Sequence, residues 1–76
     1  MSLLSIKRDK VVSSHIVAIG YDDKSKTLIV EFQAAIWSYN PVSKSTYKAL
    51  MGAESIGKYF HTNIKMDDSL IAERLQ

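Results

Sequence analysis

The chain has 76 residues, the length of one small domain, and no cysteine, so disulfide bonds and thiolate metal sites are excluded. Ten Lys and Arg against eight Asp and Glu give a net charge of +2, a basic bias too weak to indicate a nucleic-acid partner by itself. A hydrophobic content of 46% is enough for a small core, and no run of about 20 apolar residues could span a membrane. The N-terminus lacks a signal-peptide pattern, so a cytoplasmic location without membrane contact is expected.

The first 13 residues predict an N-terminal arm. Their apolar side chains follow neither the period of a strand nor that of a helix, and the charged run 7–10 interrupts them. Two outcomes remain open for the arm, an added edge strand or a loose segment. We expect residues 14–66 to form the domain and residues 67–76 a C-terminal helical tail that starts at Asp67-Asp68-Ser69.

Three strands are predicted in succession. Alternating side chains indicate a strand over 15–21, and the β-branched run 27–32 gives the clearest strand signal in the chain. The polar cluster 22–26 predicts the turn between them. A third strand is expected over 36–39, ended by Asn40-Pro41 because proline cannot donate to the ladder. Short turns between sequential strands indicate an antiparallel meander.

Two short helices should follow the strands. Ser43 is a typical N-cap, and Tyr47, Leu50 and Met51 then share one face. Gly52 occupies a position where a helix end often needs left-handed backbone. Ser55 can cap a second helix that ends near Asn63. The predicted fold class is α+β, a three-stranded antiparallel meander followed by two short helices packed on one face in two layers.

The turn after the second strand decides where Trp37 and Tyr39 point. A two-residue turn at Ala34-Ala35 would pair Phe32 with Trp37 and direct both aromatics into the core. A three-residue turn over 33–35 would flip the third strand and expose them. No glycine or asparagine selects the turn, so the alternatives stay open. We favour the inward register because a thin core needs large apolar side chains.

The ordered series of matching segments resembles the KTSC domain, a short module named for its occurrence at the C-terminus of some lysyl-tRNA synthetases. The matches are 14–22, 28–32, Trp37-Ser38-Tyr39, Tyr47, Leu50 and 53–60. Trp37 stands where the family usually has the first tyrosine of a Tyr-x-Tyr pair, no glycine lies in the hairpin, and Ser43 replaces a proline after Val42. The resemblance implies an association with RNA and carries no catalytic residues. It also implies a stand-alone bacterial or phage member of the family.

The start of the second predicted helix is a candidate phosphate site. Free backbone N–H groups attract anions, Gly57 would let an anion approach, and Lys58 would add a charge. The alternative, which we favour, is that Ser55 only caps the helix and Gly57 only permits close packing. Further candidate nucleic-acid contacts are the lysines of the helical half, Lys44, Lys48 and Lys65.

Trp37 and Tyr39 could stack on unpaired bases, but only if the outward register exposes them. No pair of residues has metal-ligand spacing, and no cofactor is expected. His15 and His61 are lone histidines, and His61 is interpreted as a partly buried packing residue. No catalytic residue is predicted, so the chain is not expected to be an enzyme.

Two functions are compatible with the sequence. The first is a small non-catalytic module that binds RNA through a lysine-bearing helical face. The alternative is a protein-interaction module or small regulator that forms a homodimer or docks on a larger host protein. The alternative rests on Ile29 and Ile36, expected on the outer sheet face, and on a third strand expected at the sheet edge.

Overall fold

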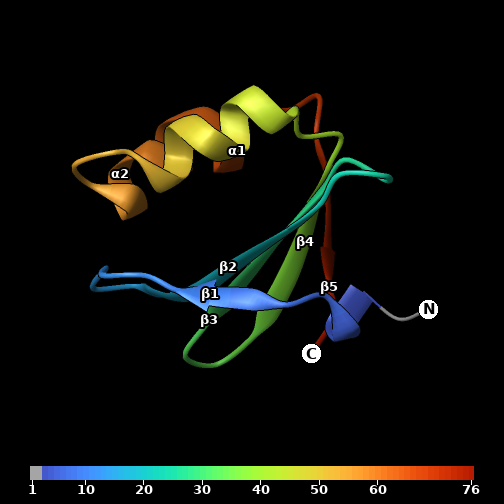
Figure 1. The fold of residues 1–76 in the computed structure, drawn as a ribbon, viewed down its shortest axis with the longest axis horizontal. Helices are drawn as coiled ribbons and strands as arrows, with labels where there is room; N and C mark the ends of the chain where they lie inside the picture. Colours follow the sequence, from blue (N-terminus) through green and yellow to red (C-terminus); the bar gives the residue numbers. More distant parts are fainter. Residues whose placement is uncertain (1–2) are drawn as a thin grey trace.

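The structure, a computed structural model, describes residues 3–76 as one antiparallel sheet with the helices packed on one of its faces (Figure 1). The strands follow one another across the sheet in the order β1-β2-β3-β4-β5. The elements are η1 (Leu3–Ser5), β1 (Arg8–Lys10), β2 (Ile16–Asp22), β3 (Thr27–Phe32), β4 (Ile36–Asn40), α1 (Lys44–Met51), α2 (Ile56–Phe60), the π-helical turn η2 (His61–Lys65) and β5 (Ile71–Arg74).

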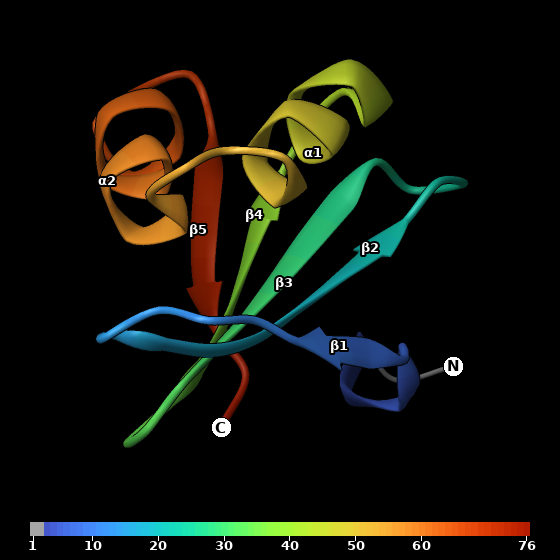
Figure 2. The same cartoon turned by 60° about the vertical axis from the view of Figure 1, so that its left-hand side comes forward.

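The fold class α+β is confirmed, but the sheet has five strands where three were predicted. The central strands β2, β3 and β4 are the predicted ones. The arm supplies β1, which pairs with β2, and the C-terminal segment returns to pair with β4 as β5. Figure 2 shows β5 running beside β4 at one edge of the sheet, with β1 at the other.

The prediction of a C-terminal helix over 67–76 is wrong. Asp67 accepts hydrogen bonds from the backbone N–H and hydroxyl of Ser69, at 2.9 and 2.5 Å, and this turn directs the chain back to the sheet. Residues 71–74 then pair with β4, although Ala, Glu and Arg all favour helix. Backbone pairing with an otherwise open sheet edge overrides that local preference.

The hairpin between β3 and β4 directs the aromatics inward, as favoured. Its two-residue turn is Gln33-Ala34, closed by a 2.7 Å hydrogen bond from the Phe32 N–H to the Ala35 carbonyl. Trp37 therefore lies opposite Val30 instead of Phe32. The observed partner is two residues away from the predicted one, so every side chain of β4 keeps its predicted face. The exposed register of the three-residue turn does not occur.

The main core lies between the sheet and the helices. Tyr39 is 7% exposed and belongs to the buried cluster, while Trp37 is half-buried against it. The inward residues predicted for the helices are confirmed, with Leu50 and Phe60 buried. The buried cluster consists of Ile16, Ile19, Leu28, Val30, Tyr39, Val42, Leu50, Phe60 and Ile64.

The outer face of the sheet is covered, contrary to expectation. Ile29 and Ser38 are completely buried there. The arm lies on this side: Arg8 forms a 2.8 Å ion pair with Glu31 and donates a 3.1 Å hydrogen bond to the Leu4 carbonyl. Figure 1 places η1 on the side of the sheet away from α1 and α2. The apolar outer patch that supported the protein-interaction alternative is therefore absent at Ile29.

The predicted helix caps are largely confirmed. The hydroxyls of Ser43 and Ser55 accept hydrogen bonds from the backbone N–H groups of Thr46 and Lys58, at 3.2 and 3.3 Å. Gly52 ends α1 at φ −94°, so the left-handed backbone expected there is wrong. The second helix continues past Asn63, because the chain passes from α2 directly into η2.

Candidate nucleic-acid interface

A basic cleft of about 550 Å³ opens where α2 meets the loop between β1 and β2. His15 comes from the loop, Lys58 from α2, and His61 from the first position of η2. Folding thus brings together two histidines that are 46 positions apart in the sequence. The residues around the cleft are Val12, Ser13, Ser14, His15, Glu54, Ser55, Ile56, Gly57, Lys58 and His61.

An aromatic pocket of about 420 Å³ lies nearby, between β4, β5 and η2. Buried Tyr39 and Phe60 meet edge to face, with ring centroids 5.3 Å apart. Phe32 also contacts Phe60 edge to face, at 5.8 Å, so the aromatic rings hold one another in place. Half-buried Trp37 completes the aromatic lining, and Lys65 and Ala72 contribute its other side chains.

A smaller hollow of about 140 Å³ joins the two sites. It shares His15, Gly57 and His61 with the basic cleft, and Phe32, Phe60 and Lys65 with the aromatic pocket. We call the three adjacent hollows together the groove. Residues of α2 and η2 contribute to all three of them.

The groove carries more cationic than anionic groups. Lys58 and Lys65 line it, against the single carboxylate of Glu54, and His15 and His61 add two imidazole side chains. Among residues 3–76, neither lysine forms an ion pair. Within that same part of the chain, no cluster of three or more His, Asp or Glu could hold a metal ion. The two lysines give the groove a positive charge that can attract an anion.

Burial raises the pKa of the Tyr39 phenol at the aromatic end of the groove. The shift has a simple cause, because desolvation penalises the charged phenolate. Tyr39 consequently stays neutral through the physiological pH range, and its hydroxyl can act as a hydrogen-bond donor or acceptor.

Four of the six predicted contact residues meet at the groove. Ser55, Gly57 and Lys58 line the basic cleft, and Lys65 lies where the hollow meets the aromatic pocket. The favoured structural roles of Ser55 and Gly57 are also confirmed. Ser55 caps α2, and a Cβ on Gly57 would lie 3.2 Å from the Ser13 hydroxyl, a tight contact that shows close packing.

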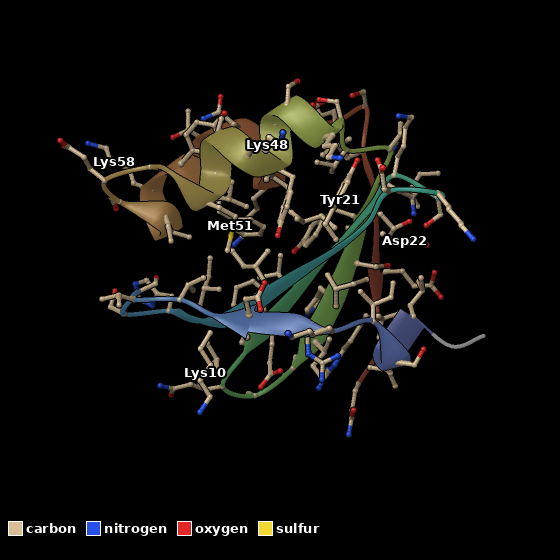
Figure 3. All side chains as sticks on the ribbon, viewed as in Figure 1. Lys10, Tyr21, Asp22, Lys48, Met51 and Lys58 are labelled. Atoms are coloured by element: carbon tan, nitrogen blue, oxygen red, sulfur yellow. The ribbon has the colours of Figure 1, made fainter. Side chains whose placement is uncertain are left out.

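Lys44 and Lys48 lie elsewhere, on α1. The Lys44 ammonium is 3.8 Å from the Asp23 carboxylate, and both side chains are exposed. Figure 3 shows Lys48 on α1, well separated from Lys58 at the far end of the helical layer. These two lysines do not belong to the groove.

Sequence reasoning missed much of the groove lining, including His15, His61 and Phe32. The interpretation of His61 as a packing residue is wrong, since its side chain is exposed on the surface of the cleft. No local pattern could have found the pair, because neither histidine lies within a helix or strand period of the other. The aromatic ring of Tyr21 does not line the groove, because it stacks on Tyr47 with ring centroids 4.8 Å apart.

The family model of the KTSC domain matches residues 12–67, about three quarters of the chain. This chain belongs to the KTSC domain family. The match spans β2, β3, β4 and the helical layer, and it includes every groove residue except Ala72. The resemblance seen in the sequence is thereby confirmed.

Two further proteins extend the comparison. A protein of Stutzerimonas stutzeri (strain A1501), described as uncharacterized, is 34% identical over 61 residues, covering 79% of this chain and 86% of that protein. The crystal structure of a KTSC domain protein from Yersinia pestis matches with a TM-score of 0.85 at 25% identity. That match covers 95% of this chain and all of the Yersinia chain.

The helices of this KTSC domain are short. Among residues 3–76, none is long and apolar enough to cross a lipid bilayer.

Proposed function

We propose that this KTSC domain is a non-catalytic module that binds single-stranded RNA along the groove. The observation that carries the proposal is the adjacency of a basic cleft and an aromatic pocket, which are linked by a hollow that shares lining residues with both. Single-strand binding commonly combines cations that contact the backbone with aromatic rings on which bases stack. The family's occurrence on a lysyl-tRNA synthetase, implied by the resemblance, favours RNA over other anions.

A binding role also agrees with the hydroxyl groups in the cleft. Ser55 accepts a hydrogen bond from the Lys58 N–H, and Ser13 accepts from the backbone of His15 and Ile16, at 3.3 Å each. Both hydroxyls are thus engaged in holding the backbone, which favours a structural role over nucleophilic attack.

A titration of fluorescently labelled single-stranded RNA by anisotropy, repeated over a salt series, tests the proposal. Phosphate contacts release counterions, so affinity should fall linearly on a log–log plot, with a slope of about −0.7 for each contact to a single strand. Lys58→Ala and Lys65→Ala should each weaken binding and reduce that slope by about one contact.

Lys48→Ala is the matched control. It removes the same charge from an exposed lysine outside the groove, so it should leave the slope unchanged. Absence of binding at low salt would refute RNA binding altogether. An equal loss of RNA affinity in Lys48→Ala and Lys58→Ala would show that the chain attracts RNA by its charge without a defined binding site.

A second candidate function, self-association, is favoured by β5. All four of its residues are exposed, and Ile71 is 66% exposed at the edge of the sheet. The Leu75 N–H donates a 2.7 Å hydrogen bond to the Ile36 carbonyl, which shows that every second residue of β5, counted back from Leu75, bonds to β4. Because antiparallel bonding alternates, the backbone groups of Ala72 and Arg74 point away from β4, where a second copy could pair.

Charge disfavours two registers of such a homodimer and permits the one centred on Ala72. With Ala72 on the two-fold axis, Ile71 lies opposite Glu73 and Leu70 opposite Arg74 of the second copy. Moving the two-fold axis to Glu73 would place the Glu73 side chains of the two copies opposite one another. Moving it to Arg74 would do the same for the two Arg74 side chains, and both arrangements bring like charges together. Light scattering over a concentration series tests this candidate. Ala72→Pro, which removes the outward N–H, should yield a monomer, and a wild type that is monomeric at all concentrations refutes it.

A further inference from the structure

We infer that the aromatic pocket seats one unstacked nucleobase of the bound strand, while the basic cleft holds the adjoining phosphates. This inference rests on the proposed RNA binding and adds the chemical form of the ligand. The bound nucleotide is single-stranded, and its base leaves the stack of its neighbours.

The size and aromatic lining of the pocket suit a planar ring. Its volume of about 420 Å³ lies in the lower part of the range typical of small-molecule sites. The edge-to-face contacts of Phe60 with Tyr39 and Phe32 fix three of its rings. Half-buried Trp37 lies beside them and offers a large π-surface to a base.

The polar groups of the pocket fit the edge of a base. Among residues 3–76, no hydrogen bond engages the Tyr39 hydroxyl or the Trp37 indole N–H. No fully enclosed side-chain atom in this part of the chain lacks a partner, so the hydroxyl of buried Tyr39 reaches solvent. Together with the ammonium group of Lys65, a hydroxyl and an N–H donor on the lining residues of this largely aromatic pocket can pair with the carbonyl and ring-nitrogen acceptors of a nucleobase.

Position and charge connect the base to its backbone. Lys65 lines both the aromatic pocket and the connecting hollow, and His61 lines both the hollow and the basic cleft. Arg74 lies directly opposite Trp37 on β5 and therefore on the same face of the sheet. Lys65 on the cleft side and Arg74 on the β5 side thus flank the pocket with positive charge, where a phosphodiester chain would enter and leave.

An aromatic side chain of a protein could fill a similar volume, but it would bring no anion to this cationic surround. A duplex would keep its bases stacked and could not fill the pocket at all. The pocket therefore distinguishes a single strand from both alternatives.

The experiment uses the whole chain and its single tryptophan, Trp37, as the reporter. A ten-nucleotide single-stranded RNA should change the emission of Trp37 as it binds. The same RNA carrying abasic nucleotides at all positions should bind about five- to 150-fold more weakly and leave the emission unchanged. The corresponding duplex should also leave the emission unchanged.

Two variants read the same interaction by anisotropy. Trp37→Ala should weaken binding of the intact strand about five- to 150-fold and leave binding of the abasic strand unchanged. Trp37→Phe should retain most of the affinity for the intact strand. Circular dichroism of both variants checks that the fold is preserved. The abasic comparison on the wild-type chain stands even if Trp37→Ala fails to fold.

The outcomes separate the two claims. If no RNA binds at low salt, the proposed function fails, and the base site fails with it. If the intact and abasic strands bind equally and the emission of Trp37 does not change, RNA binding survives and the base site is refuted. If N-acetyl-tyrosinamide quenches Trp37 while nucleoside monophosphates do not, the pocket takes a protein side chain, which also refutes the base site.

Discussion

Gly20 lies where the arm approaches the sheet closely. A Cβ built on it would lie 2.5 Å from the Lys7 carbonyl oxygen and 3.1 Å from Cγ of Arg8. Gly20→Ala should therefore force the arm away from β2 and lower the free energy of unfolding by about 1–3 kcal/mol, measured by urea denaturation. Gly52→Ala is the matched control. Its Cβ would meet the Lys48 carbonyl at an ordinary 3.5 Å, so its stability should be unchanged or slightly higher.

Asp22 gives the turn between β2 and β3 a measurable electrostatic signature. The Ser25 hydroxyl, 2.7 Å away, and the Lys24 backbone N–H both donate to its carboxylate, and they lower its pKa below the ordinary value. The hydrogen bonds favour the charged form, so their contribution to stability is complete above the unfolded-state pKa. It is lost as the pH falls through the lowered folded-state pKa.

Ser25→Ala removes the main cause of this shift. The pKa of Asp22, measured by carboxyl NMR, should then rise toward its ordinary value. The pKa of Asp67 should stay low, because its own donors on Ser69 are untouched. An Asp22 pKa that is equal in the wild type and the variant would contradict the role of the hydroxyl.

At the scale of elements, α1 is held to the sheet by a pair of tyrosines. The rings of Tyr21 on β2 and Tyr47 on α1 stack with an interplanar angle of 9°, and the Tyr21 hydroxyl donates a 2.6 Å hydrogen bond to the Val42 carbonyl. Tyr47→Ala should cost about 2 kcal/mol of unfolding free energy, since it removes a half-buried ring and its stacking contact. Lys48→Ala, on the same helix and exposed, should change stability by no more than about 0.5 kcal/mol. Equal effects of the two variants would contradict this docking role.

Elements specified by their own residues could be predicted, and elements that depend on distant pairing could not. The strand over 27–32 and the caps at Ser43 and Ser55 follow from local pattern and chemistry, and all three are confirmed. The segment 71–74 carries no strand pattern of its own. Its strand exists because β4 offers an unpaired edge, more than 30 positions earlier in the chain.

The same distinction applies to the groove. Ser55, Gly57 and Lys58 were found because they open one helix, a local feature. The partners His15 and Phe32 reach the groove from a loop and from a strand end, and only the packing of α2 against the sheet places them there. The inward direction of Trp37 was deduced from the needs of a small core, while the position of its turn depended on backbone geometry that the residue types 33–35 leave undefined.

At the scale of the molecule, both ends of the chain form the edges of one sheet. β1 and β5 enclose the three central strands, so the groove depends on the C-terminal residues as well as on its own lining. Ala72 of β5 lines the aromatic pocket, and Ser38 of β4, which pairs with Glu73 of β5, is completely buried. A chain ending at Ser69 should consequently lose stability and open the pocket from the side.

For this truncated chain we expect a loss of about 2–4 kcal/mol in unfolding free energy, because β4 loses its backbone hydrogen bonds to β5 and Trp37 loses cover. Urea denaturation measures the loss, and red-shifted Trp37 emission with stronger acrylamide quenching reports the exposure. Ile71→Ala is the control, since a side chain that is 66% exposed should contribute no more than about 0.5 kcal/mol. A truncated chain with the stability and emission of the wild type would show that β5 does not support the pocket. A truncated chain that stays unfolded in the absence of urea would show a larger dependence of the same sign.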